Sequence, residues 1–333
     1  MMTETTTAVP VAGGALDVRV GGRTGPALVF LHYWGGSADT WNGVLGHLPP
    51  GQATVRFDQR GWGTSRALPG PYHLGRLADD LARVVETCVP GPFVLVGHSM
   101  GGKVSQLFAA RRPPGLVGLV LVAPAPPRPP ATVTEEYRQG LSHAYDSPET
   151  VQHALDHVLT ATPLARTVRA TAVRDSLAAG AEARHEWPLR GIAQDITRAV
   201  RDIEVPVTVL AAENDVVEPP RVLRDHLLPH ISHATLTTVP DVGHLLPVEA
   251  PGAVATAIGG LLTAVRGSAA EGLRDVGGDA ERVLGPCRVG EADRDVEDVD
   301  DRQVGQPAAR RGQVQAEVGA ARDEERGGSV RER

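Results

Sequence analysis

Apolar and polar residues alternate along residues 16–267 in two kinds of segment. Short apolar runs rich in Val and Leu are typical of strands that are buried on both faces of a parallel sheet. Between these runs, apolar residues recur at helical spacing, as in the segment from Leu74 to Val85. The alternation predicts an α/β fold, with a mostly parallel twisted sheet flanked by helices. The expected strands are Leu16–Val20, Ala27–Leu31, Ala53–Asp58, Phe93–Gly97, Leu116–Ala123, Val207–Ala211 and Ala234–Val239.

The segment between Pro124 and Val205 has no strand pattern. It opens with several prolines and continues with residues at helical spacing. Helices that are inserted between two strands of such a sheet predict a helical cap over the site. We therefore expect a core over residues 1–125 and 204–267 and a cap over residues 126–203. The expected cap helices are Thr134–Tyr145, Pro148–Thr160, Pro163–Ala179 and Pro188–Asp202.

The composition changes again over residues 268–333. This segment contains no aromatic residue, Ile or Met and is dense in Arg, Asp, Glu and Gly. It offers too little apolar surface to offset the conformational entropy that folding removes. The sequence therefore predicts a disordered or loosely helical tail without a catalytic part.

Length and charge exclude several classes of function. The chain has 333 residues, 41% of them hydrophobic, and a net charge of −7. A negative chain without a basic run disfavours nucleic acid and anionic membrane surfaces as partners, and no apolar run is long enough to span a bilayer. Cys88 and Cys287 lack metal-ligand spacing and are expected as free thiols, which favours a cytoplasmic location. The sequence does not specify an oligomeric state.

Residues 97–101 read Gly97-His98-Ser99-Met100-Gly101 and follow directly on an apolar run. A Gly-x-Ser-x-Gly turn between a buried strand and a helix lifts the serine hydroxyl toward the mouth of the sheet. The helix N-terminus behind it favours the negative charge that develops there. The glycines are needed because such a turn leaves no space for side chains. Ser99 is therefore the expected nucleophile.

A nucleophilic serine requires a base, and the base requires an orienting anion. In this arrangement the acid and the histidine follow the serine along the chain. Asp215 lies just past an apolar strand and is the expected acid. Glu213 and Glu218 are the alternatives. His244 follows the last expected strand and is the expected base, because its imidazole titrates near neutral pH.

The loop Leu31-His32-Tyr33-Trp34-Gly35-Gly36 is expected to help bind the oxyanion. We expect one donor to be the backbone N–H of Met100, which follows the nucleophile, and the other to be the N–H of Trp34. Tyr33 is the second candidate for that loop donor. Tyr33 is also expected at the substrate pocket, and His98 is expected either to line that pocket or to pack locally. His32 is expected to brace the loop.

With these residues together, the chain resembles the α/β-hydrolase superfamily, in the branch of small bacterial esterases and cofactor-free haloperoxidase-like enzymes. The resemblance covers roughly residues 16–267 and includes the segment from Phe57 to Ser65, which we interpret as a loop brace. Many relatives have His-Gly where this chain has His32-Tyr33. The resemblance implies an α/β-hydrolase fold and no metal or organic cofactor.

These observations predict a serine hydrolase that cleaves a small carboxylic ester, or a similar acyl substrate, through an acyl-enzyme intermediate. The same three residues also serve carbon–carbon bond hydrolysis and acyl transfer to acceptors other than water. A non-catalytic ligand-binding protein on this scaffold is the alternative from a different class. The expected substrate is a small molecule, and the sequence does not specify its acyl part, its alcohol part or its stereochemistry.

Overall fold

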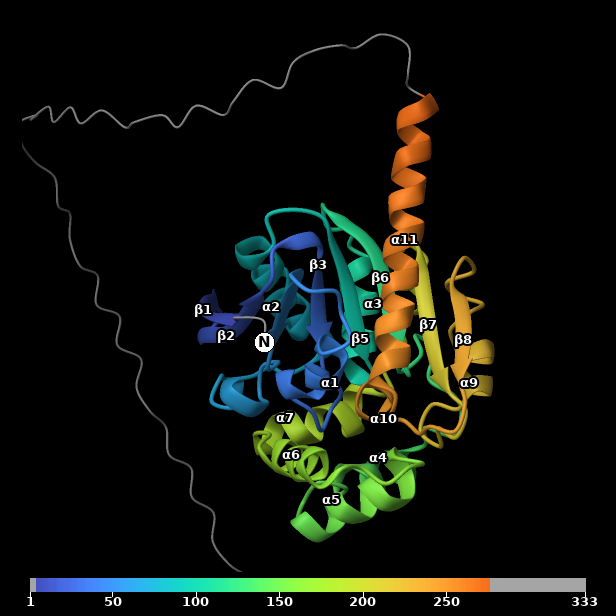
Figure 1. The fold of residues 1–333 in the computed structure, drawn as a ribbon. Coiled ribbons are helices and arrows are strands. Elements are labelled where there is room, and N and C mark those ends of the chain that lie inside the picture. Colours follow the sequence, from blue (N-terminus) through green and yellow to red (C-terminus); the bar gives the residue numbers. More distant parts are fainter. Residues whose placement is uncertain (1–3, 276–333) are drawn as a thin grey trace, which may run out of the picture. The chain divides into compact units, whose positions relative to one another are not determined.

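The computed structural model describes residues 4–275, with side chains as far as residue 267. Eight strands form one sheet in the order β1-β2-β4-β3-β5-β6-β7-β8. β1, β2 and β4 pair antiparallel and all the other neighbours pair parallel, so the predicted, mostly parallel sheet is confirmed (Figure 1). The strands are β1 Glu4–Val11, β2 Gly14–Gly21, β3 Thr24–Leu31, β4 Gln52–Phe57, β5 Phe93–His98, β6 Leu116–Val122, β7 Val207–Ala212 and β8 Thr235–Val239.

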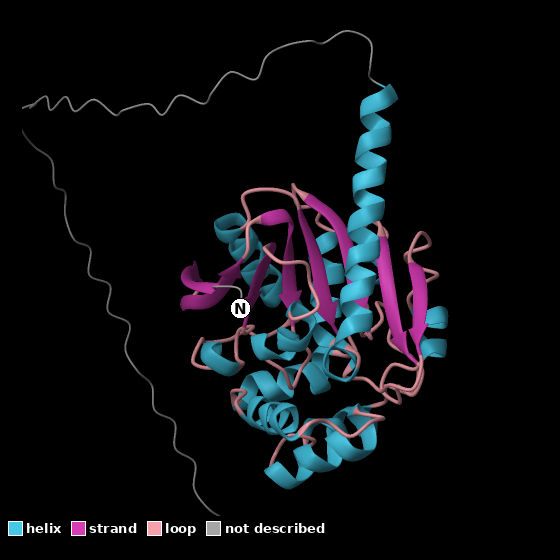
Figure 2. Cartoon of the chain, in the orientation of Figure 1, coloured by secondary structure: helices cyan, strands magenta, loops and turns pink. Residues whose placement is uncertain are grey.

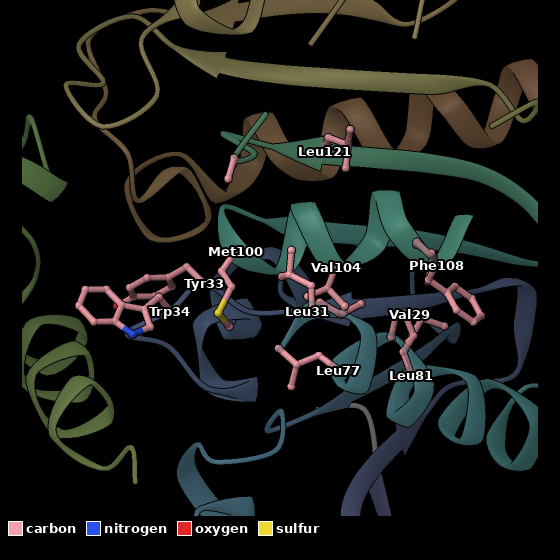
Figure 3. Packing of buried hydrophobic residues seen from close by; sticks show 14 of the residues in the cluster. Val29, Leu31, Tyr33, Trp34, Leu77, Leu81, Met100, Val104, Phe108 and Leu121 are labelled. Carbon is pink, nitrogen blue, oxygen red and sulfur yellow. The ribbon is translucent and has the colours of Figure 1, made fainter. Parts of the chain in front are cut away.

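Helices cover both faces of the sheet (Figures 1 and 2). Alternate residues of β3 separate the two cores: Val29 and Leu31 join one apolar cluster, and Leu28 and Phe30 join the other. Figure 3 shows the first cluster between the sheet and two helices. Each large apolar side chain buried in this way stabilises the fold by roughly 1.5–3 kcal/mol. The helices around the sheet are α1 Asn42–Leu45, α2 Leu74–Cys88, α3 Met100–Ala109, α9 Pro220–His226, α10 Leu246–Glu249 and α11 Pro251–Asp275, with short 3₁₀ turns η1 Ala38–Trp41 and η2 Gly63–Ser65.

Strand β1 is absent from the sequence-based prediction. Its residues Thr5–Ala8 are exposed and lack an alternation of apolar and polar side chains. β1 forms because the chain turns back through Gly13, which has a φ of 85°, and pairs along its whole length with β2. The hairpin at the sheet border thus combines backbone pairing along its whole length with burial of Val9 of β1 and of Leu16 and Val18 of β2 in the first apolar cluster.

The cap consists of helices that lie between β6 and β7 in the sequence and over the carboxyl ends of the parallel strands (Figure 1). The prediction of one helix over Pro188–Asp202 is wrong. Pro188 lies inside a wide π-helical turn that continues from α7, and α8 is a separate short helix. Inside a regular helix, a proline removes one hydrogen bond between residues four apart. In a π-helical turn the hydrogen bonds join residues five apart instead. The cap elements are α4 Glu135–Ser142, α5 Pro148–Ala154, η3 Leu155–Leu159, α6 Arg166–Leu177, α7 Ala181–Glu186, η4 Trp187–Gly191 and α8 Thr197–Val200.

Helix α11 continues to Asp275, past the predicted boundary of the core at residue 267. The expectation of a disordered tail otherwise falls on residues 276–333, which lie outside the described residues. Within the described part of the chain, every helix is too short or too polar to cross a membrane.

Candidate active site

Ser99 stands at a sharp turn between β5 and α3. Its backbone has φ 51° and ψ −116°, a conformation that side-chain-bearing residues rarely adopt. Neighbours enforce this turn, because Ser99 N donates to Val122 O and Ser99 O accepts from Lys103 N. A Cβ added at Gly101 would approach the carbonyl oxygens of β3 and the following loop at 2.5 Å. Gly101 therefore allows the close approach that holds the serine in its strained position.

The loops after β7 and β8 bring an acid and an imidazole to the same sheet edge. Asp215 follows β7 and His244 follows β8, and both side chains are almost fully buried. Asn214 N donates to Val242 O, which ties the two loops together. A Cβ on Gly243 would lie 2.7 Å from Ala161 N, so only glycine fits where this loop meets the cap.

Three side chains form a continuous hydrogen-bonded chain at this edge. Nδ1 of His244 lies 2.8 Å from Oδ2 of Asp215, and Nε2 of His244 lies 2.9 Å from Oγ of Ser99. Because a carboxylate only accepts, Nδ1 carries the proton and Nε2 accepts from the serine hydroxyl. Oδ1 of Asp215 accepts from the backbone N–H groups of Val217 and Glu218. The arrangement can therefore remove a proton from Ser99.

The loop after β3 lies beside Ser99 and is fixed on several sides. His32 accepts from Gln59 N through Nε2 and donates through Nδ1 to Tyr33 O, which confirms that it braces the loop. Asp58 accepts from Ala38 N and from Thr64, in agreement with a bracing role for this segment.

The two expected oxyanion donors have backbone N–H groups without a protein acceptor. Met100 is the first residue of α3, where an N–H has no acceptor within its own helix. Among the described residues, the backbone N–H of Trp34 has no hydrogen-bond partner. The Trp34 indole is held in place, because it stacks on Tyr145 with ring centroids 4.1 Å apart and donates to Arg184 O. Two free donors are thus available beside the serine.

His98 does not line the cavity at Ser99, which corrects the expectation of a substrate-binding role and leaves the alternative of local packing. Its ring is fully buried in β5, packs against Tyr33 and Trp41, and makes a 2.8 Å hydrogen bond through Nε2 to His244 O. Burial and the neighbouring His244 lower the pKa of His98 well below its ordinary value. His98 therefore supports the His244 loop as a neutral ring. Tyr33 does line the cavity.

A cavity of about 670 Å³ opens at Ser99 between the sheet edge and the cap. Most of its wall is apolar and aromatic, and Tyr137, Tyr145 and Trp187 come from the cap, whereas Met100 does not line it. Glu218 is the buried acid in the wall. The remaining lining residues are Tyr33, Trp34, Ser99, Gly140, Leu141, His143, Ala144, Glu149, Thr150, His153, Ala154, Val158, Leu159, Ile192, Val217 and His244.

Two acids near the site have functions that the sequence does not reveal. Glu249 accepts from Gly243 N and from the N–H groups of Ala161 and Thr162, so it joins the His244 loop to the cap. Glu213, an alternative acid in the sequence, is exposed and accepts from a backbone N–H.

Within residues 4–275, no cluster of three His, Cys, Asp or Glu side chains is arranged to hold a metal ion.

Comparison with known proteins gives a consistent result. The model of a family described as the alpha/beta hydrolase family matches residues 28–257. The chain is 29% identical to a bifunctional esterase/perhydrolase of Acinetobacter calcoaceticus over 68% of its own length and 88% of that protein. It is 37% identical to a non-heme chloroperoxidase of Streptomyces lividans over 32% of its length and 40% of that protein. A thermophilic esterase from Thermogutta terrifontis superimposes with a TM-score of 0.66 and 25% identity, covering 79% of this chain and 99% of that one.

Proposed function

Because the chain belongs to the alpha/beta hydrolase family, we propose that it is a serine hydrolase that cleaves a small carboxylic ester through an acyl-enzyme intermediate. The observation that carries this proposal is the hydrogen-bonded chain from Asp215 through His244 to Ser99 at the wall of a cavity. A nucleophile, a base and an orienting anion in contact are the groups that acyl transfer requires.

In the acylation step, Oγ of Ser99 attacks the carbonyl carbon of the ester. Nε2 of His244 takes the serine proton and returns it to the alcohol oxygen as the carbon–oxygen bond breaks. Asp215 accepts the Nδ1 hydrogen bond throughout, which keeps the imidazole in the correct tautomer and stabilises its positive charge. The products of this step are the free alcohol and an ester of Ser99.

The negative charge on the carbonyl oxygen is stabilised by the N–H groups of Met100 and Trp34. Both groups are fixed before the substrate binds, so little reorganisation is needed when the charge develops. Their lack of protein acceptors supports this assignment. In the deacylation step, His244 takes a proton from water as the water attacks the acyl carbon, and the proton then returns to Ser99.

The cavity supports a small substrate with a largely apolar body. Its volume of about 670 Å³ lies within the range of small-molecule sites in proteins. The names of the relatives favour esters, because two of those reported above are esterases. The cap supplies most of the apolar wall, so acyl chain preference is assigned to the cap.

Hydrolysis of p-nitrophenyl butyrate by purified wild type and Ser99→Ala tests the proposal. We expect the variant to lose hydrolysis by about 10⁴-fold or more, because no other described group replaces the nucleophile. Circular dichroism and thermal melting of both proteins check that the variant is folded. Retained turnover in folded Ser99→Ala would remove Ser99 from the reaction.

A further inference from the structure

Glu218 lies in the wall of the same cavity as Ser99 but has no part in the proposed proton transfer. Its side chain is deeply buried, with only 4% of the residue exposed. Oε2 of Glu218 has no hydrogen-bond partner among the described residues. A buried carboxyl oxygen without a partner loses its hydration and gains nothing in return. Because the Glu218 side chain lines the cavity and no described residue hydrogen-bonds its carboxyl group, a ligand is a partner that this group can still gain.

The position of Glu218 is fixed by the catalytic loop. Its backbone N–H donates to Oδ1 of Asp215 at 2.9 Å, so the two acids are held as neighbours. The side chain cannot replace Asp215, because His244 already donates to Oδ2 of Asp215. Burial and the charge of Asp215 raise the pKa of Glu218 well above its ordinary value, and Lys103 opposes this shift. The protein therefore favours the uncharged form of this carboxyl more than water does, and in that form the group has an O–H donor as well as acceptors.

The charges around Glu218 discriminate between classes of ligand. Lys103 is fully buried near Glu218, and its Nζ donates to Ile192 O at 3.1 Å. Its positive charge disfavours a cationic group in this part of the cavity, and the carboxylate of Asp215 disfavours an anionic one. An uncharged group that both donates and accepts hydrogen bonds fits both constraints, and a hydroxyl is the simplest such group.

We propose that Glu218 is a specificity-determining residue that hydrogen-bonds a hydroxyl group of the substrate, so that the preferred substrates are hydroxylated esters. The inference rests on the proposed function, since it assigns a substrate class to the same site. The rest of the substrate lies against the apolar wall formed by residues such as Trp187, Val217 and Ile192. A single polar position in an apolar pocket selects strongly, because a substrate without the hydroxyl leaves the buried carboxyl unpaired.

The test compares matched esters that differ only in a terminal group. One series contains p-nitrophenyl octanoate with its omega-hydroxy and omega-amino derivatives, and the other contains octyl acetate with its omega-hydroxy and omega-amino derivatives. The two series examine the acyl and the alcohol sides separately. The readout is the ratio of kcat/KM for the hydroxylated and the plain member within each variant, so a general loss of activity cancels.

Two isosteric variants separate hydrogen bonding from charge. In at least one series we expect wild type to prefer the hydroxylated ester by about tenfold. Glu218→Met removes the hydrogen-bonding group and is expected to abolish the preference. Glu218→Gln keeps an uncharged donor and acceptor and is expected to retain most of it. Glu149→Met is the matched control, because Glu149 lines the same cavity but is exposed, and its ratio is expected to equal that of wild type.

Different failures have different meanings. A hydroxyl preference that is absent from wild type in both series, or that is equal in wild type and Glu218→Met, would overturn the inference while plain-ester hydrolysis upholds the proposed function. A preference for the amino ester that Glu218→Gln removes would also overturn it, in favour of an anionic role. If wild type hydrolyses no member of either series, the proposed function fails first and this inference with it.

Discussion

The central strands of the sheet and helix α6 of the cap differ in the side chains that they bury. Strands β3, β5 and β6 carry large apolar side chains that are buried between two layers of helices. Cap helix α6 instead carries several arginines, and its buried residues are the small or polar Ala172, Asp175 and Ser176. Burial of large apolar side chains dominates stability, so the sheet provides a well-determined platform. Helix α6 contributes fewer such side chains, although other cap elements bury Val151, Leu155 and Trp187 in the same apolar cluster.

Hydrogen bonds cross the junction between the two regions, in addition to the apolar contacts of the shared core cluster. Lys103 of α3 donates to Ile192 O in the cap, and Ser176 of the cap donates to Gly35 O in the loop after β3. The Trp34 indole donates to Arg184 O across the same junction. The proposed reacting groups lie on the sheet side, and most of the cavity wall lies on the cap side. Substitutions in the two regions should therefore have different kinetic signatures.

The largest effect is expected on the sheet side, from Asp215→Asn. The amide keeps the size of the side chain but no longer holds His244 in the tautomer that accepts the Ser99 proton. We expect kcat to fall by about 10³–10⁴-fold for every ester in a panel, with KM changed little. Steady-state kinetics on short and long p-nitrophenyl esters measure this. A loss confined to one chain length would contradict the assignment of Asp215 to the chemistry.

An intermediate effect is expected on the cap side, from Trp187→Leu. Trp187 lines the cavity, so a smaller side chain makes room for bulkier acyl groups. We expect kcat/KM for bulky esters relative to acetate to increase on the order of tenfold. Trp41→Leu is the matched control, because Trp41 is fully buried in the other core cluster and does not line the cavity. The control should lower the Tm and leave the ratio as in wild type, and equal ratios in both variants would contradict the division of roles.

The last effect concerns the junction and is read from stability rather than from turnover. Burial lowers the pKa of Lys103 from 10.5 to about 8, although Glu218 and Asp195 oppose the shift. The unfolded chain therefore holds the Lys103 proton more tightly, and folding becomes more favourable as the pH rises through this interval. Relative to Lys103→Met, the free energy of unfolding of wild type should increase by roughly 3 kcal/mol between pH 8 and 10.5. Urea unfolding at several pH values measures the difference, and a constant difference would show that Lys103 is not desolvated.

The sequence predicts the sheet side of the molecule better than the cap side. Strands such as β5 and β6 are continuous apolar runs between clear turn signals, so their positions follow from local pattern alone. Ser99, Asp215 and His244 could be selected because each stands in a loop at a predicted strand end. Strand β1 could not be predicted, because its mostly exposed side chains form no alternating pattern. Its pairing with β2 defines it as a strand.

The cap could be predicted as helical but not in detail. Pro188 signals a helix start in the sequence, yet here it lies within the π-helical turn Trp187–Gly191, which continues directly from α7. The sequence also places His98 beside Ser99 and does not indicate which way its ring points. The buried position of Glu218 depends on contacts between segments far apart in the chain, which no local pattern encodes.

Reaction with a fluorophosphonate probe, followed by peptide mass spectrometry, shows directly whether His244 activates Ser99. The probe forms a covalent bond only with a serine that a neighbouring base has activated. The account predicts a single adduct on Ser99 in wild type and none in His244→Ala. An adduct on another serine, or an unmodified Ser99 in protein that still hydrolyses esters, would contradict it.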